Sequence, residues 1–89
     1  MTPFSESRFD DFLERLVRAP AGVTFSELRR FCDAVFGEGR QGGGSHRIYR
    51  TGLREPAIVN IQPQGKMAKP YQCRQVARAV RALWEKKGE

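Results

Sequence analysis

The sequence has 89 residues, enough for one hydrophobic core and too few for two, so a single domain over residues 1–89 is predicted. Hydrophobic residues make up 39% and charged residues 29%, a composition that excludes global disorder. Lys and Arg outnumber Asp and Glu by 16 to 10, and the resulting net charge of +6 favours a polyanionic partner.

The first half of the chain predicts two amphipathic helices. In the first, over roughly 8–18, apolar side chains recur at the spacing of one helix face: Phe9, Phe12, Leu13, Leu16 and Val17. The second begins at Thr24, where Glu27 three positions later completes a capping box, and Gly37 fits its end. Its apolar stripe, which predicts a buried packing role for Cys32, consists of Phe25, Leu28, Cys32, Val35 and Phe36.

A small antiparallel sheet of two to three strands is predicted next. Residues 38–41 form a weak candidate for a first strand, and the glycines at 42–44 allow a tight turn. Residues 46–50 and the β-branched run 57–62 are predicted strands, joined by a hairpin loop at 51–56.

Alternation along the predicted strand 46–50 separates its side chains into two sets. His46, Ile48 and Arg50 lie on one face, and Arg47 and Tyr49 lie on the other. Periodicity alone does not decide which of the two faces is buried.

The C-terminal third predicts a loop over 63–69 and a helix over roughly 70–86. Pro70 suits the first turn of this helix, because an N–H group there would have no intrahelical hydrogen bond and proline has no N–H. Trp84 belongs to the apolar stripe of this helix and is expected to pack in the core. The apolar stripe is Cys73, Ala77, Val80 and Trp84, and a basic stripe is Arg74, Arg78 and Arg81. The predicted order is α-α-(β)-β-β-α, an α+β fold.

Cys32 and Cys73 lie far apart in the sequence, with no Cys-x-x-Cys motif and no secretory signal, so we expect free thiols in a cytoplasmic protein. The apolar N-terminal segment is too short for a membrane span. The chain has one histidine and no spacing typical of metal ligands, so we expect neither a metal site nor another cofactor.

Two segments resemble the HicA-type mRNA-interferase toxins: Gly-Gly-Gly-Ser-His-Arg-Ile-Tyr (42–49) and Lys-Met-Ala-Lys-Pro-Tyr-Gln-Cys-Arg-Gln-Val (66–76). That family pairs a Gly-Ser-His-x-x-aromatic strand start with a basic loop leading into the last helix, and Tyr49 here has the aromatic position. The resemblance covers about residues 23–84. It implies a fold like a double-stranded-RNA-binding domain (dsRBD), α-β-β-β-α, with residues 1–20 as an N-terminal helical extension.

The functional histidine of that family corresponds to His46. The resemblance implies the toxin of a type II toxin–antitoxin system, an endoribonuclease that cleaves mRNA without a metal ion and is neutralised by a HicB-type antitoxin. Histidine suits this chemistry, because RNA supplies its own 2′-hydroxyl nucleophile and an imidazole with an ordinary pKa of about 6.5 exchanges protons at cellular pH. One histidine cannot be both base and acid in one step. The second role falls to Tyr49, a lysine, water or the His46 of a second subunit.

Basic residues provide the predicted RNA contacts. Lys66 and Lys69 precede a helix N-terminus, whose N–H groups attract phosphate, and A-form RNA is recognised mostly through phosphates and 2′-hydroxyls. The further predicted contacts are Ser45, Arg47, Arg50, Arg74 and Arg78. The same patch also fits a non-catalytic RNA-binding module, a domain that binds an acidic protein, or a solvated helix face.

Overall fold

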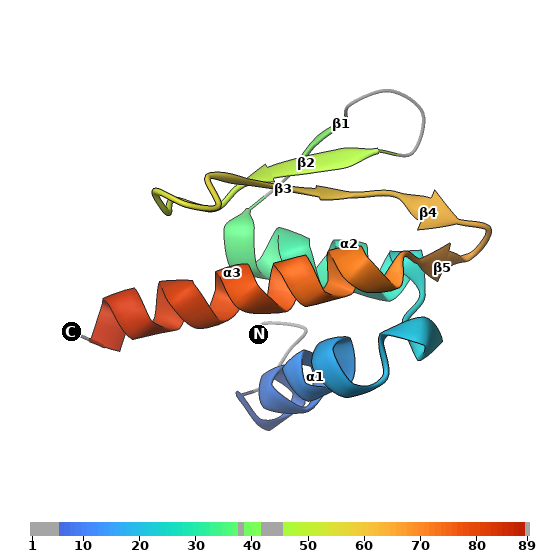
Figure 1. Ribbon diagram of the computed structural model, residues 1–89, viewed down its shortest axis with the longest axis horizontal. Helices are drawn as coiled ribbons and strands as arrows, with labels where there is room; N and C mark the ends of the chain where they lie inside the picture. The colour runs from blue at the N-terminus through green and yellow to red at the C-terminus, as the bar shows by residue number, and fades with distance from the viewer. Residues whose placement is uncertain (1–5, 38, 42–45, 89) are drawn as a thin grey trace.

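The structure is a computed structural model that describes residues 6–37, 39–41 and 46–88 (Figure 1). The elements in chain order are α1 (Glu6–Arg18), the 3-10 helix η1 (Pro20–Gly22), α2 (Phe25–Phe36), β1 (Arg40–Gln41), β2 (Arg47–Arg50), β3 (Ile58–Ile61), β4 (Pro63–Gln64), β5 (Met67–Ala68) and α3 (Pro70–Gly88). All strand pairs of the described residues are antiparallel, and the predicted α+β class is confirmed. None of the described helices combines the length and apolarity needed to cross a bilayer.

The three strands β1, β2 and β3 form one sheet in chain order, and β1 is the weakly predicted first strand. β2 pairs with β3 from Arg47–Ile61 at one end to Arg50–Ile58 at the other. Helices α2 and α3 cover one face of this sheet, and α1 lies on the far side of the helix layer (Figure 1). No described element covers the other face of the sheet, which we call the uncovered face.

Local sequence explains where α2 begins, because the predicted capping box is confirmed. Thr24 Oγ1 accepts a hydrogen bond from the Glu27 N–H at 3.1 Å, and the Glu27 carboxylate accepts one from the Thr24 N–H at 3.0 Å. Arg15 of α1 also donates to this carboxylate, at 2.9 Å, a contact that the sequence did not predict. The bonds from Arg15 and from the Thr24 N–H favour the charged form and lower the pKa of Glu27 to about 2.

The apolar stripes of all three helices meet the inner face of the sheet in one core. Its buried members are Phe12, Leu13, Leu16, Val23, Leu28, Phe31, Cys32, Tyr49, Val59, Ile61, Ala68, Cys73, Val76, Ala77, Ala79 and Val80. Helix α1 contributes the first three of these side chains, so it packs in the same core as the sheet-covering helices. The predicted burial of Cys32 is confirmed.

The structure also decides which face of β2 is buried. Tyr49 is 1% exposed and pairs with Val59, which is 3% exposed. Directly opposite residues of an antiparallel pair point to the same side, so β2 buries the residues that pair with Val59 and Ile61. The core-facing residue of this strand is therefore Tyr49, and Ile48 points to the uncovered face.

The predicted loop 63–69 contains a small hairpin instead, formed by β4 and β5. Backbone bonds attach this hairpin to the segment before α2: the Ala68 N–H donates to the Val23 carbonyl at 2.9 Å, and the Phe25 N–H donates to the Lys66 carbonyl at 3.0 Å. Strands of two residues have no measurable alternation, so tertiary hydrogen bonding rather than a sequence pattern defines them.

The prediction that Trp84 packs in the core is wrong. Trp84 is 43% exposed and stacks on Phe9 of α1, with ring centroids 4.4 Å apart. The last turns of α3 extend beyond the strands of the sheet (Figure 1), and the ring contact shown for Trp84 is with Phe9 of α1. Helical spacing identified the correct stripe, but not the point at which the neighbouring layer ends.

Candidate functional site

His46, the predicted catalytic residue, directly precedes β2 and is partly exposed. His46 is two residues before Ile48, so the alternation of β2, continued by one residue, assigns its side chain to the uncovered face, opposite to the buried Tyr49. Arg47 lies on the same side of the strand as Tyr49 and is partly buried, so the strand separates it from His46. Ser45, another predicted contact, lies outside the described residues.

The uncovered face carries both polar and apolar side chains around His46. Ile48 and Arg50 share this face, and β3 adds Asn60 opposite Ile48 and Ile58 opposite Arg50. Ile58 is 51% exposed, an unusually open position for a large apolar side chain in a strand. Arg50 is four positions after His46, roughly 13 Å along a strand, so a ligand that contacts both must extend along β2.

A pair of side-chain hydrogen bonds joins the start of α3 to the sheet end that carries His46. Arg47 of β2 pairs with Ile61 of β3. His46 comes directly before Arg47 and Gln62 directly after Ile61, so both lie at the same end of the sheet. Gln62 Oε1 accepts from Lys69 Nζ at 2.7 Å, and the Gln62 N–H donates to Gln72 Oε1 at 2.7 Å. These bonds hold Lys69 and the first turn of α3 at the His46 end.

Lys66 lies in the turn between β4 and β5 and is exposed. Gly65 in the same turn has φ +64°, a left-handed conformation that glycine adopts without strain. The Lys66 carbonyl accepts the Phe25 N–H at the start of α2. Lys66 and Lys69 are therefore near the N-termini of two different helices, whereas the sequence placed both before the last one.

Tyr49, a predicted candidate for the second proton-transfer group, is bound elsewhere. Its hydroxyl donates to Asp33 Oδ1 of α2 at 2.7 Å and lies 3.4 Å from the Arg29 carbonyl oxygen. Burial, together with the bond to Asp33, raises the pKa of Tyr49. The phenol is neutral and faces away from His46, so the remaining candidates are a lysine, water or the His46 of a second copy.

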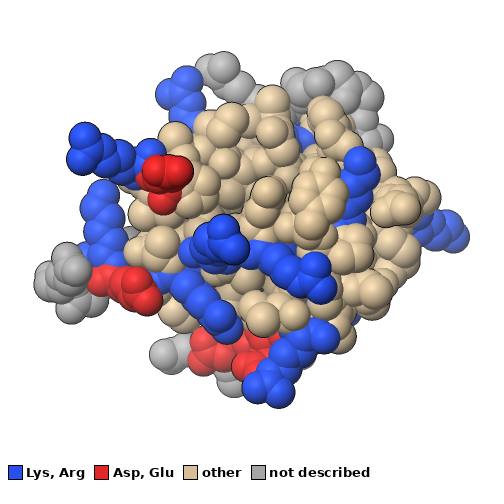
Figure 2. Space-filling view, viewed as in Figure 1, with Lys and Arg blue, Asp and Glu red and all other residues tan. Residues whose placement is uncertain are grey.

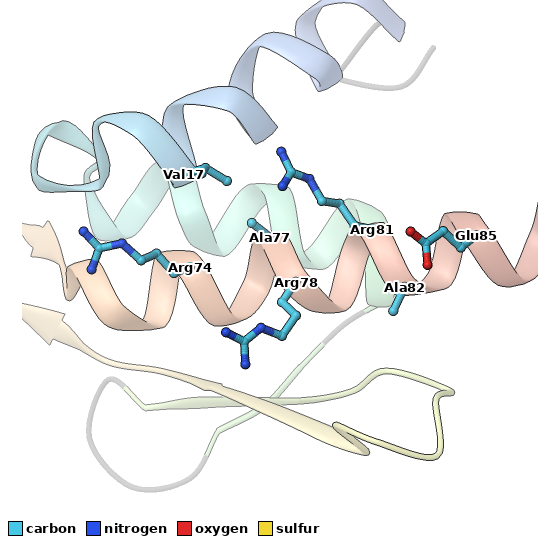
Figure 3. A pocket seen from close by; sticks show the side chains of 7 residues that line it. All are labelled: Val17, Arg74, Ala77, Arg78, Arg81, Ala82 and Glu85. Atoms are coloured by element: carbon cyan, nitrogen blue, oxygen red, sulfur yellow. The ribbon is translucent and has the colours of Figure 1, made fainter.

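The predicted basic stripe of α3 is exposed and borders a groove between α3 and α1 (Figure 3). The groove is lined by Val17, Arg74, Ala77, Arg78, Arg81, Ala82 and Glu85. Arg81 extends toward α1, whereas Arg78 extends toward the strands and also lines a second groove beside β3. Sequence reasoning placed Arg81 on the stripe but assigned it no site, because only the packing of α1 against α3 forms the groove.

The described residues contain no group of three or more His, Cys, Asp or Glu side chains that could hold a metal ion. Cys32 and Cys73 are free, buried thiols. Burial raises the pKa of both, that of Cys73 to about 11, so both are packing groups rather than reactive ones.

A scan of protein-family models, a search of curated proteins and a search of solved structures found no match to this chain. The candidate site consists of His46 directly before β2, Lys69 at the start of α3, and the uncovered face that extends from them to Arg50.

Proposed function

We propose that this chain is a metal-independent endoribonuclease of the HicA toxin type, which cleaves mRNA in the cytoplasm and is inhibited by a HicB-type antitoxin. One observation carries the proposal: His46 directly precedes β2, at the sheet end where Gln62 holds Lys69 and the first turn of α3. One end of the fold therefore holds His46, which can transfer protons, the cation Lys69, and the N-terminus of α3, which attracts anions. Cleavage of a phosphodiester needs groups of these kinds.

The arrangement of elements supports the same proposal. Helix α2 precedes and α3 follows the three-stranded sheet β1-β2-β3, and both helices lie on one face of it. Apart from the short β4–β5 hairpin before α3, the order is α-β-β-β-α. That order is the one expected for a dsRBD-like domain over about residues 23–84. The Gly-Ser-His element directly precedes β2 in the sequence, and α1 lies before the stretch that the family resemblance covers.

In the proposed reaction, His46 removes the proton of an RNA 2′-hydroxyl while the 2′-oxygen attacks the adjacent phosphorus. The P–O5′ bond breaks, and the leaving 5′-oxygen takes a proton from a second group or from water. The products are a 2′,3′-cyclic phosphate and a 5′-hydroxyl, so atoms and protons balance without an added reactant. Lys69 Nζ gives one hydrogen bond to Gln62 and has further donors for the phosphate.

The other predicted RNA contacts extend from this end of the fold. Arg50 shares the uncovered face with His46, and Lys66 is exposed on the neighbouring hairpin turn. Arg74 and Arg78 follow along α3. Contacts of this kind are directed at phosphates, so we expect binding that is sensitive to salt and selective for RNA shape rather than for base sequence.

A non-catalytic RNA-binding module is the second candidate function, and the position of Tyr49 favours it. A single chain needs a second proton-transfer group, and the Tyr49 hydroxyl is bound to Asp33 on the opposite side of β2. The two candidates differ in turnover, since only the nuclease produces new RNA ends.

The test compares the wild-type protein with His46→Ala on a labelled RNA, in the presence of EDTA. The nuclease proposal predicts cleavage by the wild type and none by His46→Ala, with RNA affinity and melting temperature nearly unchanged. Arg54→Ala, in the exposed loop between β2 and β3, is the matched control and should cleave like the wild type. Equal cleavage by His46→Ala would refute the catalytic role, and wild-type binding without cleavage would favour the RNA-binding module.

A further inference from the structure

The groove between α1 and α3 has an apolar floor and a basic rim. Val17, Ala77 and Ala82 are the apolar residues that line the groove, and Figure 3 shows Val17 and Ala77 between the two helices. The two alanines are small, so they leave room for a ligand side chain. The basic rim consists of three arginines on successive turns of α3: Arg74, Arg78 and Arg81.

The arginines of this rim have no acidic partner among the described residues. The ion pairs found among described residues of α1 and α2 include Arg15–Glu27, Arg18–Glu14 and Arg29–Asp33, none of which involves α3. Even Glu85, one turn after Arg81, forms no ion pair with it. Figure 2 shows basic side chains across the middle of this face, over α3, with acidic ones nearer its margins. The positive charge is uncompensated, so an anionic ligand gains Coulomb energy here.

We propose that this groove binds an acidic amphipathic helix of a partner protein. Arg74 and Arg81 are seven residues apart on α3, so the basic rim is about 10 Å long, the rise of two helical turns. A helix with acidic side chains at i, i+4 and i+7 matches this length, and its apolar side chains fit the floor. RNA offers phosphates for the rim but has no aliphatic side chains for Val17, Ala77 and Ala82 to contact.

A second copy of this chain is a poor occupant, because each copy carries a net charge of +6. The groove and His46 also lie on different sides of the molecule, since the α2–α3 layer separates the uncovered face from α1 (Figure 1). The docking proposal therefore does not need the catalytic role of His46. It does involve Arg74 and Arg78, which the proposed function assigns to RNA contact, so RNA is the competing occupant.

The test uses three fluorescent probes: a synthetic helical peptide with Leu on one side and Glu at i, i+4 and i+7, the same peptide with Gln for Glu, and a single-stranded oligouridine RNA. Anisotropy measures their binding to the full chain. The acidic peptide should bind roughly tenfold more tightly than the Gln peptide, as expected for several exposed ion pairs of modest strength. Added salt should reduce this difference.

Two variants locate the binding site. Arg81→Glu removes a rim charge, and Ala82→Gln fills the hollow without changing charge while keeping a good helix former. Each should weaken the acidic peptide at least about fivefold, because one alters the Coulomb energy and the other the fit. Arg54→Glu, with the same charge change in the β2–β3 loop, should change the affinity less than about twofold.

Four results would overturn the inference. The first is an acidic-peptide affinity that both Arg81→Glu and Ala82→Gln leave unchanged, and the second is no peptide binding at millimolar protein. The third is oligouridine binding that Ala82→Gln weakens as strongly as it weakens peptide binding, which would assign the groove to RNA. The fourth is self-association of the wild type that Arg81→Glu abolishes in sedimentation experiments, which would assign the groove to a second copy.

Discussion

Replacing Tyr49 by Phe separates the structural role of its hydroxyl from any role in proton transfer. The substitution keeps the buried ring and removes only the donor that bonds Asp33 Oδ1 at 2.7 Å. A hydrogen bond to a charged group contributes about 1.5–3 kcal/mol. Asp33 is partly exposed and also lies 3.7 Å from an Arg29 nitrogen, so water and Arg29 replace part of the loss. We expect Tyr49→Phe to cost about 1–2 kcal/mol.

Thermal and urea unfolding measure this cost, and each kcal/mol lowers the melting temperature of a domain of this size by about 4–8 °C. Tyr71→Phe is the matched control, because Tyr71 is 54% exposed and should change stability by less than about 0.5 kcal/mol. Alkaline pH gives a second readout. The raised pKa of Tyr49 means that its contribution is complete below about pH 10 and is lost as the pH rises further. Tyr49→Phe should lack this alkaline loss.

The same variant tests the chemistry. Because the phenol faces away from His46, Tyr49→Phe should cleave RNA at the wild-type rate at temperatures where it remains folded. A large loss of cleavage in a folded Tyr49→Phe protein would refute the inferred orientation of β2 and restore Tyr49 as the second proton-transfer group. No change in stability would contradict the Asp33 bond.

Two further predictions concern the same framework. Gly39→Ala should lower the free energy of unfolding by about 1–3 kcal/mol, because a Cβ there would lie 2.6 Å from the buried Tyr49 ring; urea unfolding measures this, and a neutral result would contradict the packing. The lowered pKa of Glu27 predicts stability that is complete above about pH 4.5 and is lost as the pH falls toward about 2. Glu27→Gln, which weakens the bonds from Arg15 and Thr24, should be less stable at neutral pH and lose less on acidification; parallel acid titrations would count against the ion pair.

The helices could be predicted from the sequence because their signals are local. Helical spacing identified the apolar stripes, and the Thr24–Glu27 capping box gave the start of α2 within one residue. The ion pair from Arg15 could not be predicted, because it joins two residues that only the packing of α1 against α2 brings together. The hairpin of β4 and β5 was missed for the same reason, since its backbone bonds lead to Val23 before α2 and to Phe25, the first residue of α2.

The candidate site shows the same division. The motif identified His46, but the face on which it lies depended on β3, whose Val59 and Ile61 decide that Tyr49 is buried. The sequence of β2 alone does not decide which face is buried, because Ile48 lies on one face and Tyr49 on the other. Lys69 was predicted correctly as a residue at the start of α3, yet its link to the His46 end depends on Gln62.

The chemistry of the RNA ends tests the central claim most directly. Mass spectrometry of the products formed by the purified protein in EDTA identifies the group left on each 3′-end. The proposed function of His46 predicts 2′,3′-cyclic phosphates that are absent with His46→Ala, and no cleavage where a 2′-deoxynucleotide removes the attacking hydroxyl. Products with 3′-hydroxyl ends, or cleavage that continues at the deoxynucleotide, would contradict it.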